Sequence, residues 1–153
     1  MSNTASTTLK EHLTTEMKVS MRAKDKQRLV VIRSLLAAIK QVEIDSQITL
    51  DETATLAIFD KAMKQRRDSY QQFLDAERPD LADQEAYEMT VIQDFMPEAL
   101  MEDEINVLID SAMTDSGATT MQDMGKVMGL LKPKMQGRAD MAVVSKLIKA
   151  RLG

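Results

Sequence analysis

The chain has 153 residues, 13 methionines, no tryptophan, no cysteine and a formal net charge of −4. The lack of cysteine excludes disulfides, thiolate metal ligands and a thiol nucleophile, and a single histidine leaves too little material for an ordinary zinc site. A core built mainly from Leu, Ile, Val, Ala and Met, with aromatic residues at only 3%, favours helices over sheets.

Apolar spacing and capping signals predict four helices before residue 97. They should cover residues 8–23, 25–47, 49–76 and 79–95. The first and third begin at capping-box patterns, Thr8 with Glu11 and Thr49 with Glu52. No strand pattern is present, so these helices should form a bundle.

Bases on the third of these helices form a possible second binding surface. By angular count, Arg67 falls inside the apolar stripe and Arg66 lies at its edge. Burying an unpaired base is costly, so one interpretation is an ion pair with Glu85 or Glu88 of the next helix. The other interpretation is that Lys64, Arg66 and Arg67 line a ligand surface.

We expect a domain boundary in the segment 96–100. It would separate an N-terminal helical domain, residues 1–97, from a C-terminal domain, residues 98–153, whose three short helices include one stopped by Gly117. The fold class is therefore expected to be all-α, with an N-terminal bundle of about four helices followed by a small three-helix domain.

Charge is divided unequally along the chain. Residues 121–153 hold seven bases and two acids, a net charge of +5, whereas residues 1–120 sum to −9. A basic C-terminal piece on an acidic body indicates an anionic partner at that end.

The stretch from residue 124 to residue 140 gathers glycines and bases. On a helix, Gly125, Gly129 and Lys132 would share a flank beside the core-facing stripe, with Lys126 further round. A flank with little side-chain bulk lets another backbone approach closely, and the lysines add positive charge. The alternative is that the two glycines serve close packing between helices.

The residues that follow this flank suit an anion as well. Pro133 should end the helix, leaving Lys134, Gly137 and Arg138 on a loop before Asp140 caps the last helix. Bases, a glycine and unpaired backbone N–H groups at a helix start together fit a phosphate oxygen.

Catalytic patterns are missing from the sequence. No Gly-x-x-x-x-Gly-Lys-Ser/Thr loop, Gly-x-Ser-x-Gly elbow or His-Glu-x-x-His pair occurs, so we expect no independent catalytic site and no cofactor or metal. No apolar run is long enough to span a bilayer, and the first eight residues lack the features of a signal peptide. We therefore expect a cytoplasmic protein that does not bind a membrane.

Four motifs are distinctive when taken together. They are Met63-Lys64-Gln65-Arg66-Arg67-Asp68-Ser69, Phe95-Met96-Pro97 with Leu100, Asp123-Met124-Gly125-Lys126-Val127-Met128-Gly129, and Gly137-Arg138-Ala139-Asp140. With these motifs the chain resembles the free-standing members of the GatB/YqeY family over essentially its whole length.

The resemblance implies that the C-terminal domain is similar to the tail domain of GatB, a subunit of the tRNA-dependent amidotransferase, where the tail engages the tRNA body. The expected function is thus that of a tRNA-binding accessory. The candidate tRNA-binding residues are Lys126, Gly129, Lys132, Lys134, Gly137 and Arg138. Gln136 departs from this picture, because a base there would strengthen the loop.

The resemblance also implies the label of a carbon–nitrogen ligase with glutamine as amido-N-donor. The larger catalytic portion of GatB has no counterpart in this chain, so such activity would require a partner. Two alternatives to tRNA binding stay open. One is a helical adaptor that docks a protein, such as an amidotransferase or aminoacyl-tRNA synthetase subunit; the other is an amidotransferase component acting in trans.

Overall fold

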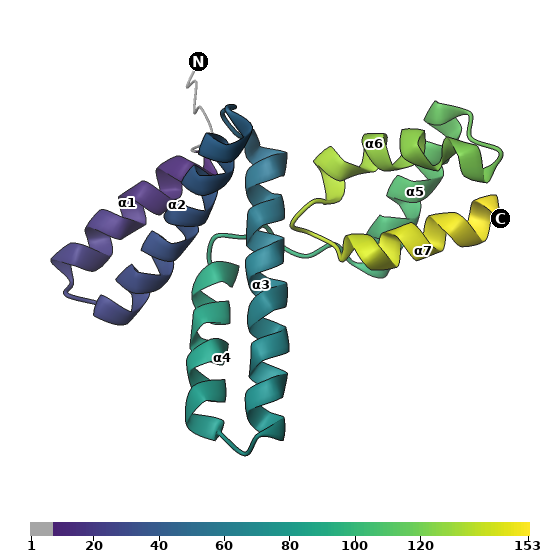
Figure 1. Ribbon diagram of the computed structural model, residues 1–153. Coiled ribbons are helices and arrows are strands. Elements are labelled where there is room, and N and C mark those ends of the chain that lie inside the picture. Colours follow the sequence, from purple (N-terminus) through teal and green to yellow (C-terminus); the bar gives the residue numbers. More distant parts are fainter. Residues whose placement is uncertain (1–7) are drawn as a thin grey trace. The chain divides into compact units, whose positions relative to one another are not determined.

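A computed structural model describes residues 8–153, and the described part of the chain contains helices and no strand (Figure 1). Its helices are α1 (Leu9–Arg22), α2 (Lys26–Ser46), α3 (Glu52–Asp75), α4 (Pro79–Gln93), α5 (Glu102–Ser116), α6 (Met124–Met135) and α7 (Met141–Leu152), with a short 3-10 turn, η1 (Met121–Asp123), before α6. The all-α prediction is confirmed. Most of the N-terminal segment that the signal-peptide argument concerned lies outside the described residues.

The chain divides into two compact units between Met96 and Pro97. The first unit holds two helical hairpins, α1–α2 and α3–α4 (Figure 1). Helix α2 packs on α1, α3 and α4, and α3 and α4 run antiparallel along much of their length. The second unit holds α5, α6 and α7, with α6 packed on both of the others.

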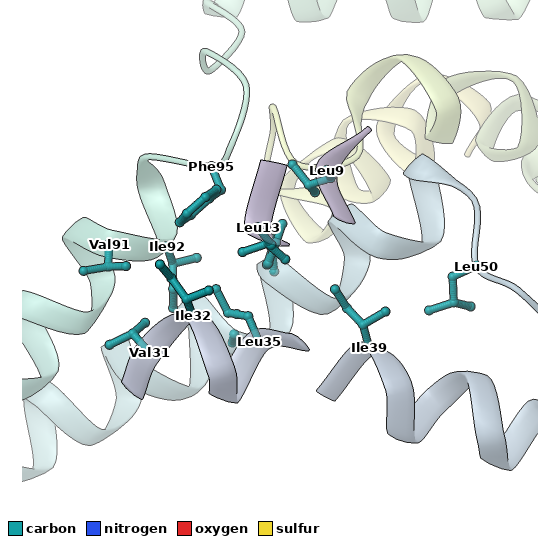
Figure 2. Close-up of a cluster of buried hydrophobic side chains, with 12 residues drawn as sticks. Leu9, Leu13, Val31, Ile32, Leu35, Ile39, Leu50, Val91, Ile92 and Phe95 are labelled. Carbon is teal, nitrogen blue, oxygen red and sulfur yellow. The ribbon is translucent and has the colours of Figure 1, made fainter. Parts of the chain in front are cut away.

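The core of the first unit forms where the two hairpins meet (Figure 2). Its buried side chains come from all four helices, from the segment before α3 and from the turn after α4: Leu9, Leu13, Val31, Ile32, Leu35, Ile39, Leu50, Phe59, Ala62, Val91, Ile92 and Phe95. These residues recur at three- and four-residue intervals on α2, as one face of a helix requires. The opposite face of α2 is left toward solvent.

The helix starts follow the capping rules with one correction. The capping box of Thr8 and Glu11 is confirmed, and Asp25 accepts a hydrogen bond from the backbone N–H of Arg28. The second capping box is wrong, because α3 begins at Glu52 and is capped by Asp51, which accepts from the N–H of Ala54 at 2.8 Å. Glu52 instead accepts the N–H of Leu9 at 3.0 Å.

The second unit has its own core, built from all three of its helices. The buried residues are Ile109 and Ala112 of α5, Val127, Leu131 and Met135 of α6, and Val144, Ile148 and Leu152 of α7. Gly117 ends α5 in the left-handed conformation, with φ 67°, as its position predicts.

Helix α6 departs from prediction at its end. Pro133 lies inside the helix, which continues to Met135. The proline lacks only the N–H that would bond to the carbonyl of Gly129, and both residues are exposed, so water can satisfy that carbonyl. Burial of Met135 then favours the final turn, and Lys134 belongs to the helix rather than to a loop.

Candidate nucleic-acid interface

The flank of α6 that turns away from the core carries the residues expected to meet an anion. Val127 and Leu131 are fully buried, whereas Gly125, Lys126, Gly129 and Lys132 are all exposed. At about 100° per residue, the two glycines lie next to each other between Lys132 on one side and Lys126 on the other. This surface, Gly125, Gly129, Lys126 and Lys132, is called the glycine flank.

The glycines do not serve packing within the described structure. A Cβ atom built at Gly125 or Gly129 would meet no atom within 4 Å. Helix packing is therefore no reason for glycine here, and each glycine weakens the helix by about 0.5–1 kcal/mol relative to alanine. The glycine flank leaves exposed backbone that another molecule can approach closely.

Lys134 does not join the glycine flank. It follows Lys132 by two residues, which places the two side chains about 200° apart around α6. Lys134 therefore lies opposite Lys132, about 80° beyond Lys126 around the helix and beside the exposed side chain of Leu130. The bases expected to form one cluster are divided between two sides of the helix.

The turn between α6 and α7 is held by backbone hydrogen bonds. The N–H groups of Arg138 and Ala139 both donate to the carbonyl of Met135, at 2.8 and 3.0 Å. Gly137 has φ 80°, a left-handed conformation that favours glycine. Asp140 caps α7 by accepting from the N–H of Ala142 at 2.9 Å, as predicted.

Arg138 ties this turn to the start of the second unit. Its Nε donates to the carbonyl of Glu98 at 3.0 Å, and its own carbonyl accepts from the N–H of Leu100 at 2.8 Å. The side chain is half-buried. Arg138 thus fixes the segment 98–100 against the turn, a structural role that sequence reasoning missed because the partner lies 40 residues away.

Charge is segregated among the helices of the second unit. Helix α5 carries five acids and no base, whereas α6 and α7 each carry three bases and no acid. An ion pair between Arg151 and Asp110 joins α7 to α5. Most acids of this unit therefore lie on α5, whereas the glycine flank lies on α6.

Asp123 is the acid nearest to this flank in the sequence. The backbone N–H groups of Thr119 and Thr120 donate to its carboxylate, at 2.9 and 3.2 Å. These hydrogen bonds, with a smaller contribution from the charge of Lys126, hold the pKa of Asp123 below its ordinary value. The carboxylate is thus occupied at the start of η1, where it accepts these two backbone N–H groups.

The possible second surface on α3 is corrected in one respect. The buried face of α3 runs through Thr55, Phe59 and Ala62, so Arg66 rather than Arg67 points inward. Arg66 lies 3.7 Å from the carboxylate of Glu88, and its Nη1 donates to the carbonyl of Ala62. The ion-pair interpretation therefore holds for Arg66.

The reason for the correction lies in the second half of α3. Tyr70 and Leu74 suggest a stripe that includes Arg67, but Leu74 is 42% exposed and contributes nothing to the core. Lys64 and Arg67 are exposed and lie apart from the paired Arg66. Beside that pair, burial and the neighbouring Glu88 raise the pKa of Glu85.

Two features of the described residues bear on other kinds of site. Among residues 8–153 there is no group of three or more His, Asp or Glu side chains placed to hold a metal ion. None of the described helices combines the length and the apolar character needed to cross a membrane.

Comparison with curated proteins finds relatives that share one printed name, "Altered inheritance of mitochondria protein 41, mitochondrial". The relative from Eremothecium gossypii is 45% identical over 86 residues, which cover 56% of this chain and 47% of the relative. The relative from Lachancea thermotolerans is 36% identical over 68% of this chain and 57% of its own length. In Saccharomyces cerevisiae a relative is 32% identical over 74% of this chain and 65% of its own length.

These relatives correct one expectation. They are named as mitochondrial proteins, which contradicts the cytoplasmic location expected from the sequence. That expectation rested on the lack of a recognisable signal, and composition alone holds little information on location. The chain spans about half to two thirds of the length of these relatives, with 47%, 57% and 65% covered.

Family membership is established by a separate match that covers nearly the whole chain. A family model described as "Yqey-like protein" matches residues 10–152, a range that includes all of the helices except the first residue of α1. The match spans both compact units and therefore the glycine flank as well as the α3–α4 hairpin. The chain belongs to the YqeY-like family.

Proposed function

We propose that this protein is a tRNA-binding accessory related to the tRNA-dependent amidotransferase, and that it contacts the RNA backbone through its second unit. The observation that carries the proposal is the glycine flank. Two glycines that no packing contact requires lie on an exposed helix face between Lys126 and Lys132. A phosphate backbone can approach such a face closely and meet a lysine on either side.

The charge distribution supports the same partner. The six bases of α6 and α7 lie on helices that contain no acid, so these two helices carry net positive charge that attracts a polyanion. No aromatic residue occurs between residues 97 and 153, which removes base stacking as a means of recognition. The contacts would thus position the RNA by its shape and phosphates.

The roles of the candidate residues differ within this proposal. Lys126, Gly129 and Lys132 contact the RNA from the glycine flank, and Lys134 reaches it only from the opposite side of α6. Gly137 and Arg138 act mainly by shaping the turn that leads into α7, because Arg138 already donates to Glu98.

A variant pair tests the proposal. Changing Lys126 and Lys132 to glutamine should weaken binding of a tRNA transcript and flatten its dependence on salt, because two phosphate contacts are lost. The matched control, Lys61→Gln with Arg78→Gln at exposed positions outside the candidate surfaces, removes the same charge from the other unit. Equal loss in both variants would show that overall charge matters and would overturn the site.

A second candidate function is a helical adaptor that docks a protein partner. It is favoured by Val143 and Leu147, which are 50% and 37% exposed one turn apart on the outer face of α7. Salt-insensitive association with an amidotransferase or aminoacyl-tRNA synthetase subunit, lost on Leu147→Glu, would support it. A component of a glutamine-dependent carbon–nitrogen ligase acting in trans is a third candidate, marked by amidation that appears only when this chain joins a partner.

A further inference from the structure

The α1–α2 hairpin contains a stretch as basic as the end of the chain, although residues 9–46 as a whole hold eight bases and five acids, a net charge of +3. Residues 17–42 hold seven bases and one acid, a net charge of +6, and residues 124–153 also hold seven bases and one acid. The stretch between them, residues 43–123, holds five bases and twenty acids, a net charge of −15. The acidity of the first 120 residues therefore comes from α3, α4 and α5 and not from the first hairpin.

Six of these bases are exposed and lie opposite the core or at the turn between the two helices. They are Lys18 and Arg22 of α1, Lys24 of the turn, and Lys26, Arg33 and Lys40 of α2. These six residues are called the hairpin surface. The three bases of α2 follow one another at seven-residue intervals, about 10.5 Å apart along the helix, on the side opposite the buried positions.

The bases of the hairpin surface do not stabilise the fold through ion pairs. Of the bases on this hairpin, only Lys10 and Arg28 form ion pairs within the described chain. Lys18 and Arg22 are like charges four residues apart, a spacing that destabilises a helix, although Arg22 lies in the last turn of α1, where the helix dipole favours a base. Lys26 lies in the first turn of α2, where the helix dipole also disfavours a base.

Lys24 shows the same lack of structural benefit. It has φ 58°, a left-handed conformation in which glycine is more stable than any residue with a side chain. Gln47 occupies the equivalent position after α2, also with φ 58°, and offers an uncharged comparison. A lysine at residue 24 adds charge to the turn at a cost in backbone energy.

We propose that the hairpin surface is a second contact for the phosphate backbone of a folded RNA, separate from the glycine flank. The inference extends the proposed function and rests on it for the identity of the polyanion. No aromatic ring belongs to this surface, so its bases would meet phosphates rather than stacked bases. Each unit would then offer its own basic surface to the RNA.

The apolar residues of this face favour RNA over a lipid surface. Val30 and Ile44 of α2 are 63% and 60% exposed but lie fourteen residues apart, and Val19 and Met21 of α1 are 46% and 49% exposed. Interfacial binding to lipid grows with the apolar area that is buried, and these separated side chains offer little of it. The bases lie among them along the whole helix and dominate the face.

A triple variant of the full chain tests the inference. Lys26→Gln, Arg33→Gln and Lys40→Gln together should lower affinity for an unmodified tRNA transcript at least tenfold at low salt and reduce the log–log salt slope by about 2–3. The matched control is Lys61→Gln, Arg78→Gln and Lys146→Gln, three exposed bases outside the hairpin surface, the glycine flank and the possible second surface of α3. Equal changes in both triple variants would overturn the inference.

Comparison with the variant of the glycine flank separates the two proposals. Wild-type affinity in the α2 triple variant, with loss in the Lys126→Gln and Lys132→Gln pair, would overturn the hairpin surface and leave the proposed site standing. Loss in the α2 variant alone would support the hairpin surface and overturn the glycine flank. If the wild-type chain binds no RNA but binds phosphatidylglycerol vesicles through these three bases, a lipid partner replaces RNA and the inference is wrong.

Substitutions to glycine at two equivalent turns provide a test that is independent of unfolding. Lys24→Gly should be at least as stable as the wild type, since glycine suits φ 58°, and yet bind tRNA two- to fivefold more weakly. Gln47→Gly should be equally stable and bind like the wild type. Unchanged tRNA affinity in Lys24→Gly would remove the turn from the hairpin surface.

Discussion

Gly129→Ala should make the protein more stable and less able to bind RNA. Gly129 lies inside α6, is exposed, and has no atom within 4 Å of the place where a Cβ would stand. The methyl group therefore meets no obstacle, and alanine should stabilise the helix by about 0.5–1 kcal/mol. For a unit of this size the change corresponds to a rise in melting temperature of about 2–8 °C.

The same methyl group should hold an RNA backbone away from the glycine flank. Loss of one close contact corresponds to a three- to tenfold weaker affinity, or about 0.7–1.4 kcal/mol. Thermal unfolding followed by circular dichroism and tRNA binding by fluorescence anisotropy measure the two effects on one sample. Gly137→Ala is the control for stability, because φ 80° at that position should make alanine destabilising.

Two results would refute this reasoning. A lower melting temperature for Gly129→Ala would mean that the glycine packs closely against another part of the molecule. Higher stability with unchanged tRNA affinity would mean that the flank is exposed but takes no part in RNA binding.

Three further predictions concern stability. Glu88→Gln should cost about 1–3 kcal/mol, because it leaves the half-buried guanidinium of Arg66 without its ion pair; urea unfolding measures this, and an unchanged midpoint would refute it. Glu43 accepts hydrogen bonds from the side chain of Lys10 and the N–H of Leu50, and these hold its pKa below the ordinary value. The stability that Glu43 contributes is therefore complete above its unfolded-state pKa of about 4.3. That stability is lost as the pH falls through the lower folded-state pKa. The Glu43→Gln variant should accordingly lose less stability than the wild type as the pH falls below that value. Acid-unfolding curves of equal steepness for the two proteins would contradict this role of Glu43. Arg138→Ala should destabilise the second unit by about 1 kcal/mol, because the hydrogen bond to the carbonyl of Glu98 is lost. Hydrogen exchange of the amides in the segment 98–100 should become faster. Unchanged exchange would show that other contacts hold the segment.

Most of the fold follows from local signals in the sequence. Pro79 begins α4 and Gly117 ends α5, because each residue restricts or permits the backbone conformation that its position requires. The start of α3 does not follow from the capping-box pattern at Thr49, since Asp51 also offers a capping oxygen and only the actual first turn decides between the two.

Tertiary packing explains the other differences. The choice between Arg66 and Arg67 depends on which face of α3 meets α4, and Leu74 misled the count because it is exposed. Pro133 stays within α6 because burial of Met135 favours another turn. Neither effect can be read from residue spacing within one helix.

The candidate site was predictable in its residue types but not in its arrangement. Glycines and lysines gather on one stretch of the sequence, and helical spacing groups Gly125, Gly129 and Lys132, all of which are exposed on α6. It did not reveal that Arg138 binds the backbone at Glu98, because that contact joins distant parts of the second unit. It also hid the hairpin surface, since the sum of charge over residues 1–120 averages a basic hairpin with acidic helices.

Binding of total tRNA across a salt series is the most direct test of RNA recognition by this protein. The account predicts tighter binding to tRNA than to an RNA duplex of similar length. The log–log salt slope should be roughly −2 to −4 if the glycine flank and its neighbours act alone. The slope should be steeper if the hairpin surface also binds the RNA. Absence of tRNA binding at low salt would contradict the account and favour a protein partner at the exposed residues of α7.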